Sequence, residues 1–301
     1  MGRWERALDA AGVDGARLRG EYGQQREQAA RYKREAVLAA ELLLPPGLVP
    51  HVIAATAFMH RTDGLLDSGP VAERRQAYAR WEREVADGLA TGDSGNPQLR
   101  PLLNTVAAHP VLHDRILDYL DTALLDLDFT GFTTEADYQR YLDGYSLPAF
   151  MVVAALLGPD RDQTAYRAGC RTFIDASQRL DFVNDLAEDL ADGRLTIPSQ
   201  TLEQHRVTRA DLEQARDLPT VRALITGLLD QVDRTLARGR AVVELVPPAH
   251  RPMVRCMVRL DELTSAAARA DIPALLRRPA GPRKPAAALL AREYLRPAAA
   301  R

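Results

Sequence analysis

Helix-forming segments fill most of this chain of 301 residues, and this pattern restricts the fold more than any other feature of the sequence. Residues 21–43 are rich in Ala, Glu, Arg and Leu and contain neither Gly nor Pro after Gly23. Runs of alternating apolar and polar residues, which are typical of half-buried strands, are absent from the sequence. We therefore predict an all-α protein, with further helices at residues 51–67, 71–90, 99–127, 134–157, 160–192, 208–245 and 248–269.

The interior of the chain has no segment typical of an interdomain linker. Even the Gly/Ser/Asn-rich stretch 91–98 is short enough to join neighbouring helices. We predict one domain, residues 26–285, preceded by an N-terminal arm, residues 1–25. Residues 286–301 are rich in Ala, Arg and Pro, and we expect this tail to be poorly ordered.

The composition excludes several classes of protein. The balance of 39 basic and 41 acidic side chains gives no electrostatic reason to expect a nucleic acid as partner. Because the sequence has no uncharged apolar run long enough to span a bilayer and no apolar leader, we expect a cytoplasmic protein without a transmembrane segment; peripheral membrane contact stays open. Cys170 and Cys256 lack metal-binding or redox spacing, which suits a reducing cytosol. No glycine-rich dinucleotide loop supports the use of NADPH.

Aspartates gather at one-turn spacing in two separate helical segments. In "DFVNDLAEDLADGRLTIP", residues 181–198, Asp181, Asp185 and Asp189 recur every fourth residue, so like charges share one helix face and repel one another. In "HRTDGLLDSG", Asp63 and Asp67 lie near the C-terminal end of a helix, where the helix dipole disfavours negative charge. A single pair usually marks a solvated face, but two unfavourable pairs on separate helices indicate a function.

Magnesium and diphosphate together explain this pattern. Mg²⁺ prefers oxygen ligands and commonly binds one or two carboxylates together with phosphate oxygens of a substrate. Two facing aspartate pairs could hold a small magnesium cluster, which would neutralise a diphosphate as it departs. The same cations would offset the repulsion among the carboxylates.

The two aspartate regions resemble those of the squalene/phytoene synthase family. "LLPPGLVPHVIAATAFMHRTDGLLDSG", residues 43–69, is similar to the first region of that family, and "QRLDFVNDLAEDLADGRLTIP", residues 178–198, to the second. The resemblance extends over about residues 30 to 290, and the hydroxysqualene synthase branch looks nearest. It implies the all-α isoprenoid synthase fold, a helical bundle around a deep apolar pocket.

The resemblance also implies a set of site residues. Asp63 and Asp67 would bind magnesium from one side, and Asp185 and Asp189 from the other, with more than one ion between them. Asp181 could recruit a further ion. Asn184, Glu188 and Asp192 have the spacing of the metal motif of class I terpene cyclases, although Glu188 replaces the usual Ser or Thr. The candidates for binding diphosphate are Arg194, Lys33, Arg34 and His60, and those for the pocket walls are Phe58, Ala149, Phe150 and Phe182. Lys33 and Arg34 could equally be surface charges on a helix.

Several positions depart from the family pattern. Gly64 stands where the first motif has its second Asp, and His60 stands where an Arg is expected. A glycine-rich run of the central helix is replaced by "SLPAFMVV", which places Pro148 within a predicted helix, where it should produce a kink. The other departures are Thr56 for Tyr, Asp181 for Asn, Asn184 for Arg and Thr196 for Tyr. These changes spare the four aspartates but alter the pocket and the diphosphate clamp.

The sequence therefore predicts a magnesium-dependent enzyme that ionises an allylic prenyl diphosphate, farnesyl or geranylgeranyl diphosphate. Family membership favours head-to-head coupling of two such molecules through a cyclopropyl intermediate. The altered pocket favours an alternative, a class I terpene cyclase that acts on a single prenyl diphosphate. A second alternative is a non-catalytic helical binding protein that kept the fold, but the retention of all four aspartates argues against it.

Overall fold

The computed structural model describes residues 2–67, 69–127 and 129–296, and within these ranges it contains helices and no β-strand. This confirms the all-α prediction. The helices are α1 (Arg3–Ala10), α2 (Ala16–Leu43), η1 (Pro46–Leu48), α3 (Val49–Asp67), α4 (Val71–Thr91), α5 (Arg100–Ala108), α6 (Val111–Leu127), α7 (Glu135–Tyr141), η2 (Leu142–Ser146), α8 (Leu147–Leu157), α9 (Gln163–Asn184), α10 (Leu186–Ala191), α11 (Ser199–His205), α12 (Arg209–Glu213), α13 (Pro219–Gly239), α14 (Val242–Leu245), α15 (Arg251–Ala270), α16 (Ile272–Leu275) and α17 (Arg283–Leu295).

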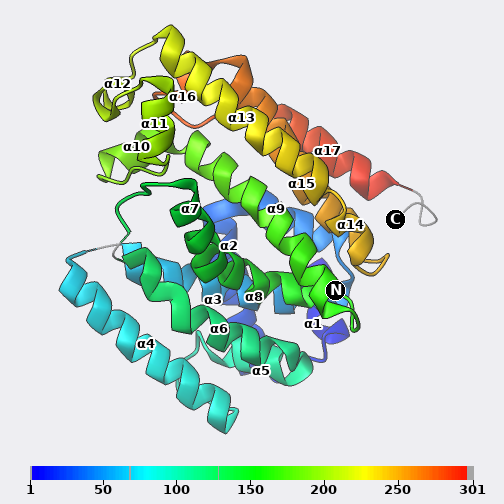
Figure 1. Cartoon of the computed structure of the whole chain (residues 1–301). Coiled ribbons are helices and arrows are strands. Elements are labelled where there is room, and N and C mark those ends of the chain that lie inside the picture. Colours follow the sequence, from blue (N-terminus) through cyan, green and yellow to red (C-terminus); the bar gives the residue numbers. More distant parts are fainter. Residues whose placement is uncertain (1, 68, 128, 297–301) are drawn as a thin grey trace.

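Helix α9 runs through the middle of the molecule (Figure 1). Helices α13, α15 and α17 lie on one side of it, and α2, α3, α6 and α8 lie on the other. The most extensive contact joins α9 to α13, and α2 packs along α3. One large apolar core connects the two sides, so the helices that carry both aspartate regions belong to a single packed body. In the described part of the chain, no helix is long and apolar enough to cross a membrane.

Proline and loop residues divide several helices that the sequence predicts as continuous. Residues 99–127 form α5 and α6, which are separated at His109 and Pro110. Residues 160–192 are interrupted at Asp185, between α9 and α10. At Pro148 the structure shows a π-helical segment, η2, directly before α8. The backbone at Tyr141, Ser146 and Leu147 stays in the α-helical region, so the helix continues through this segment and the π-helical turn accommodates the missing N–H of the proline.

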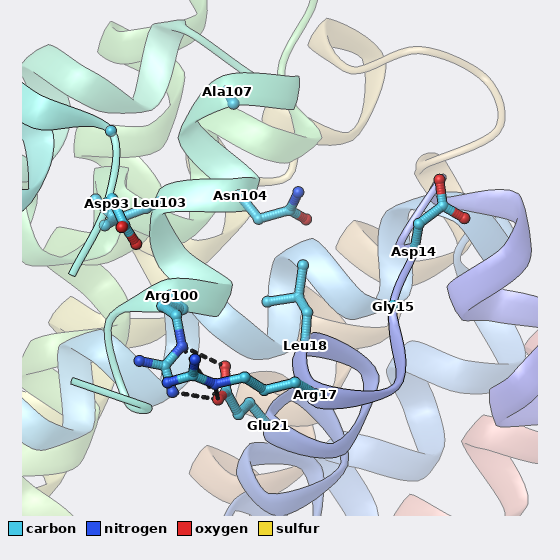
Figure 2. A pocket seen from close by; sticks show the side chains of 11 residues that line it. Asp14, Gly15, Arg17, Leu18, Glu21, Asp93, Arg100, Leu103, Asn104 and Ala107 are labelled. Atoms are coloured by element: carbon cyan, nitrogen blue, oxygen red, sulfur yellow. Dashed lines mark hydrogen bonds and ion pairs between the residues drawn. The ribbon is translucent and has the colours of Figure 1, made fainter. Parts of the chain in front are cut away.

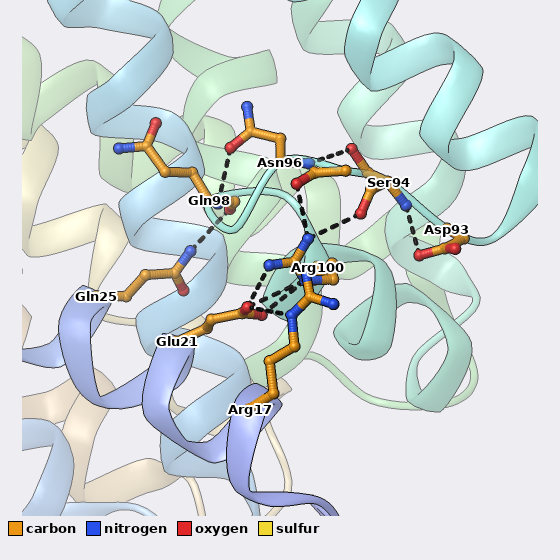
Figure 3. A network of polar contacts seen from close by, with 9 residues as sticks. Arg17, Glu21, Gln25, Asp93, Ser94, Asn96, Gln98 and Arg100 are labelled. Carbon is orange, nitrogen blue, oxygen red and sulfur yellow. Dashed lines mark hydrogen bonds and ion pairs between the residues drawn. The ribbon is translucent and has the colours of Figure 1, made fainter.

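The first part of α2 is held against α5 by a network of polar contacts (Figures 2 and 3). Glu21, which is only 6% exposed, accepts hydrogen bonds from Arg100, with Nε to Oε2 at 2.9 Å, and from Arg17. The bond from Arg100 holds the pKa of this carboxyl below its ordinary value. At the next residue, the Tyr22 hydroxyl donates to the carbonyl of Pro101 at 2.9 Å. Helix α2 thus continues through residue 25, where the sequence predicts the end of an N-terminal arm.

The C-terminal segment forms a helix where the sequence predicts a poorly ordered tail. Residues 286–295 belong to α17, and residues 297–301 lie outside the described ranges. Leu289 and Leu290 pack beside Leu43 and Cys256, and Glu293 accepts a hydrogen bond from Arg255 Nε at 3.0 Å. An Ala/Leu-rich segment with one buried ion pair can form a helix of this kind because its apolar side covers α2 and α15.

Candidate active site

The first aspartate pair lies on α3, and two tyrosines from other helices fix one of its members. The hydroxyl groups of Tyr119 on α6 and Tyr145 in η2 both donate to Oδ1 of Asp63; the distance from Tyr145 is 3.0 Å. Burial raises the pKa of Asp63, and the two hydrogen bonds act in the opposite direction. The carboxylate is therefore held in one orientation at the edge of the core.

Asp67 ends α3 one turn later and is accessible to water. Partial burial is the largest cause of its raised pKa, and the negative charges of Asp126 and Asp63 raise the pKa further. Arg194 and Arg74 lower it. The first pair thus lies in a negative environment that a cation would relieve.

The second pair lies at the junction of α9 and α10. Asp185 has a non-helical ψ of 11° between the two helices, yet the Asp185 N–H donates to the Asp181 carbonyl at 2.8 Å and the Asp189 N–H to the Asp185 carbonyl at 2.9 Å. The one-turn spacing of Asp181, Asp185 and Asp189 therefore survives the interruption. Burial raises the pKa of Asp189 to about 6, against the lowering effects of Arg194 and Thr196. Burial and the charge of Glu188 also raise the pKa of Asp185.

Arg194 acts electrostatically on one carboxylate of each pair. Its Nη2 donates to Oδ1 of Asp126 at 2.7 Å, and its charge lowers the pKa of both Asp67 and Asp189. Because such effects weaken with distance, the guanidinium must be near both carboxylates. Local structure explains the position: Gly193, with φ +80°, ends the turn after α10, and Leu195 bridges to Gly131. The binding of a diphosphate by Arg194 stays a prediction.

Lys33 lies at an interruption of α2. Its φ of −142° and ψ of 73° break the helix, and its ammonium group lowers the pKa of Asp181, Asp185 and His60. Burial is the larger cause of the lowered pKa of His60. Lys33 is exposed, and its charge acts on two aspartates of the second region, so its role at a diphosphate stays a prediction. Its neighbour Arg34 is exposed, and the described part of the chain shows no contact between it and the aspartates.

A further carboxylate meets Asp181 from α15. Asp261 raises the pKa of Asp181, although burial is the larger cause, and the pKa of Asp181 reaches about 7. Asp181 is open to water yet surrounded by protein, as expected for a side chain that lines an internal space. Oδ2 of Asp261 is buried and has no hydrogen-bond partner among the described residues, and burial raises the pKa of Asp261 to about 6.

The two remaining metal candidates have different environments. Asn184 uses its Oδ1 to accept the N–H of Ala280 at 2.8 Å, and its Nδ2 donates to Asp185 at 3.4 Å. Its only side-chain oxygen thus already accepts one hydrogen bond, from the backbone before α17. Glu188 is exposed on α10. Both remain predictions, but the geometry favours the aspartates.

The predicted pocket residues fall into three environments. Phe58 is 2% exposed and packs between Trp81 and Tyr119, with ring centroids 6.0 and 6.1 Å away. The ring centroid of Phe150 lies 5.8 Å from that of Phe173, and both Phe150 and Ala149 pack against the large apolar core. Phe182 belongs to an aromatic cluster with Phe129, Phe132, Tyr138, Tyr141 and Tyr145.

The aromatic cluster lies beside the charged groups of the site. The Arg194 guanidinium is 5.0 Å from the centre of the Phe129 ring, and the Tyr141 hydroxyl donates to Oδ1 of Asp126 at 2.6 Å. Asp126 is buried, so it depends on Tyr141 and Arg194 for its hydrogen bonds. Apolar surface and charge thus meet at one place.

Sequence reasoning missed the side chains that support the aspartates, namely Tyr119, Tyr141, Tyr145, Asp126 and Asp261. Only Asp126 carried a usable signal, because a charged residue within the apolar stretch "ALLDLDF" must find a buried partner. The tyrosines look like ordinary core residues of amphipathic helices, and their partners are far away in sequence.

A cavity of about 780 Å³ adjoins the first pair. Its walls come from α2, α3, α4 and the loop before α5, and its lining residues are Gln25, Gln28, Ala29, Arg31, Ala57, Phe58, His60, Arg61, Asp63, Gly64, Asp67, Trp81 and Gln98. The 400 Å³ cavity between α2 and α5 contains none of the aspartates of either pair.

The carboxylates of the site suit one mode of metal binding. Among the described residues, no three Asp, Glu, His or Cys side chains converge closely enough to hold one. Magnesium does not require such a cage, since one or two carboxylates with water and substrate oxygens suffice. The crowded carboxylates, whose pKa values are raised on both sides of Arg194, fit that mode of binding.

Helices that surround a core and carry two aspartate pairs define the isoprenoid synthase fold. The family model for squalene/phytoene synthase matches residues 30–292, so the chain belongs to the squalene/phytoene synthase family, whose members are prenyltransferase-type synthases. The chain is 30% identical over 239 residues to the bifunctional protein CrtB/UppS of Streptomyces coelicolor, which covers 79% of this chain and 41% of that protein. It is 24% identical over 207 residues to the 15-cis-phytoene synthase of Synechococcus elongatus, which covers 64% of this chain and 65% of that one. The chain thus spans less than two thirds of the length of either relative.

Solved structures agree with this assignment. The squalene synthase HpnC from Alicyclobacillus acidocaldarius is 25% identical and superposes with a TM-score of 0.73, over 90% of this chain and 99% of that one. A dehydrosqualene synthase in complex with a ligand has the same fold, with a TM-score of 0.78 at 18% identity, over 92% of this chain and 96% of that one. The predicted family and fold are both confirmed.

Proposed function

We propose that this protein is a magnesium-dependent synthase that couples two prenyl diphosphates, farnesyl or geranylgeranyl diphosphate, head to head. Membership of the squalene/phytoene synthase family supports the class of reaction. The observation that carries the proposal to this chain is the position of Arg194, whose charge acts on a carboxylate of each aspartate pair.

The chain's own residues divide the work of ionisation. Asp63 and Asp67 on one side, and Asp185 and Asp189 on the other, would hold magnesium, which neutralises the diphosphate as the allylic C–O bond breaks and its electron pair leaves with the diphosphate. Arg194 would donate to diphosphate oxygens, and Lys33 would add positive charge from α2. Tyr119 and Tyr145 keep the Asp63 carboxylate oriented throughout.

The carbocation left behind must be protected from water. The aromatic cluster, which comes from the loop before α7 and from α7, η2 and α9, lies beside Arg194, where the diphosphate would leave. The ring centroid of Phe129 lies 4.6 Å from that of Phe132 and 4.9 Å from that of Tyr141, so the rings form a closely packed surface. Such a surface excludes water and presents electron-rich ring faces to a cation.

A cyclase that acts on one prenyl diphosphate is the alternative. In the segment "SLPAFMVV", which replaces a glycine-rich run of the family, the ring of Phe150 on α8 packs with its centroid 5.8 Å from that of Phe173 on α9. Side chains in place of glycines leave less room between these helices. Coupling requires room for two prenyl chains, whereas cyclisation requires room for one. The carbon number of the product distinguishes the two reactions.

The test uses purified protein with C10, C15 and C20 prenyl diphosphates, with Mg²⁺ or with EDTA, and mass spectrometry of hexane extracts. We expect a C30 or C40 hydrocarbon that forms only with Mg²⁺. A C15 or C20 cyclic product would replace coupling by cyclisation. Full turnover in EDTA would contradict the metal site, and no turnover of any substrate would favour the non-catalytic binding protein.

A further inference from the structure

We propose that Arg61 and Arg31 form an additional diphosphate-binding side of the first aspartate pair and take up a metal-bound diphosphate in the 780 Å³ cavity. This inference rests on the proposed function, because it names further residues for the same substrate group. Arg61 lies within the first aspartate region, two residues before Asp63, whereas Arg31 comes from a different helix, α2.

The cavity has charges of both signs on its walls. Asp63 and Asp67 from α3 are negative, and Arg61 from α3 and Arg31 from α2 are positive. Its volume is within the range of sites that enclose small molecules. A cavity lined in this way suits a ligand that carries both signs, and a diphosphate with bound magnesium is such a ligand: the carboxylates face the cation, and the guanidinium groups face the phosphate oxygens.

The charges on the walls do not neutralise one another. Asp63 uses its Oδ1 for the hydroxyl groups of Tyr119 and Tyr145, and the arginines whose charges act on Asp67 are Arg194 and Arg74. In the part of the chain that the structure describes, neither Arg31 nor Arg61 forms an ion pair with these aspartates. Both guanidinium groups are exposed to the solvent of the cavity and keep their donors available.

Arg61 is held in place by an aromatic platform. Its guanidinium lies 5.9 Å from the centre of the Trp81 ring, and Trp81 is 4% exposed. The Trp81 Nε1 donates to Oγ1 of Thr62, the next residue of α3, at 2.9 Å, and its ring stacks on Phe58. A guanidinium over the face of an indole gains a cation–π attraction and keeps its N–H groups available to phosphate oxygens.

Gly64 keeps the space between these groups open. It lines the cavity beside Asp63, and a Cβ at this position would meet no atom within 4 Å. Where the family pattern has a carboxylate, this chain therefore has room. A phosphate group can occupy that room between the aspartates of α3 and the two arginines.

The experiment measures binding of inorganic diphosphate, with and without Mg²⁺, by isothermal titration calorimetry. The proteins are the wild type, Arg61→Gln, Arg31→Gln and Arg61→Lys. Arg80→Gln is the matched control, because Arg80 is an exposed arginine of α4 that does not line the cavity. We expect each Gln variant to bind magnesium diphosphate about tenfold more weakly, or worse, and Arg61→Lys to recover part of the loss. Circular dichroism melting curves check that the variants fold.

Kinetics with the prenyl diphosphate provide a second readout. A binding role predicts that Arg61→Gln raises KM with little change in kcat, whereas a structural role would lower the melting temperature as well. Unchanged diphosphate affinity in both Gln variants, or equal losses in Arg80→Gln, would overturn the inference while the proposed function stands. If no prenyl diphosphate is turned over but Arg61→Gln still loses diphosphate affinity, the anion site stands and the proposed function fails.

Discussion

Replacing Asp63 by alanine should remove activity and also destabilise the protein, unlike the same change at Asp185. Crowding among carboxylates would suggest that any one of them can be removed without loss of stability. Asp63 differs because Tyr119 and Tyr145 both donate to its Oδ1. Alanine would leave two tyrosine hydroxyls of the core without that acceptor.

The size of the effect follows from these two bonds. A buried donor that loses its acceptor costs about 1–3 kcal/mol, and relief from burying the Asp63 charge offsets part of the sum. We expect a net loss of about 2–4 kcal/mol in the free energy of unfolding. For a chain of 301 residues, this corresponds to a melting temperature lower by about 3–6 °C. Asp185 accepts one weak hydrogen bond, from Asn184 at 3.4 Å, so Asp185→Ala should change the melting temperature by only about 1 °C.

Differential scanning calorimetry of the metal-free proteins measures the difference, and kcat with the prenyl diphosphate measures the loss of function. Both alanine variants should lower kcat by orders of magnitude. Asp63→Asn is the control, since it keeps an oxygen acceptor for the tyrosines but lacks the charge; it should melt near the wild type and remain inactive. Equal melting temperatures for the two alanine variants would refute the reasoning, and near-normal turnover in either would show that the site is assigned wrongly.

Two further predictions concern pH. Burial lowers the pKa of His51 from 6.5 to about 4, so the stability that neutral His51 provides is complete above about pH 6.5 and is lost as the pH falls toward 4. In urea unfolding over this range, the free energy of unfolding of His51→Asn should fall by up to about 3 kcal/mol less than that of the wild type. Parallel pH profiles of the two proteins would contradict this. Burial raises the pKa of Asp181 from 3.8 to about 7, so the free energy of unfolding falls as the pH rises through this interval. Because the side chain is open to water, Asp181→Asn should stabilise the metal-free protein above pH 7 by only about 1–2 kcal/mol. An unchanged midpoint of urea unfolding above pH 7 would contradict the assignment.

The sequence by itself determined the helices, the two aspartate regions and the family. Helix propensity and the absence of alternating patterns are local properties, so they can be read from neighbouring residues. The one-turn spacing of Asp185 and Asp189 is local in the same sense, because a backbone hydrogen bond across four residues sets it. Breaks were harder to place: Pro148 signalled an interruption, but whether it becomes a kink or the π-helical segment η2 depends on the helices packed around it.

Only the tertiary structure decided what surrounds the aspartates. Tyr119 and Tyr145 reach Asp63 from 56 and 82 residues away, and Arg194 reaches Asp126 from 68 residues away. No spacing in the sequence encodes such pairs, because they depend on how α3, α6 and α9 pack together. Lys33 shows the same limit, since the break in α2 at this residue and the effect of its charge on Asp181 cannot be read from the helical pattern. Helical period is a property of the chain, whereas burial and long-range charge are properties of the packed molecule, and those set the chemistry of this site.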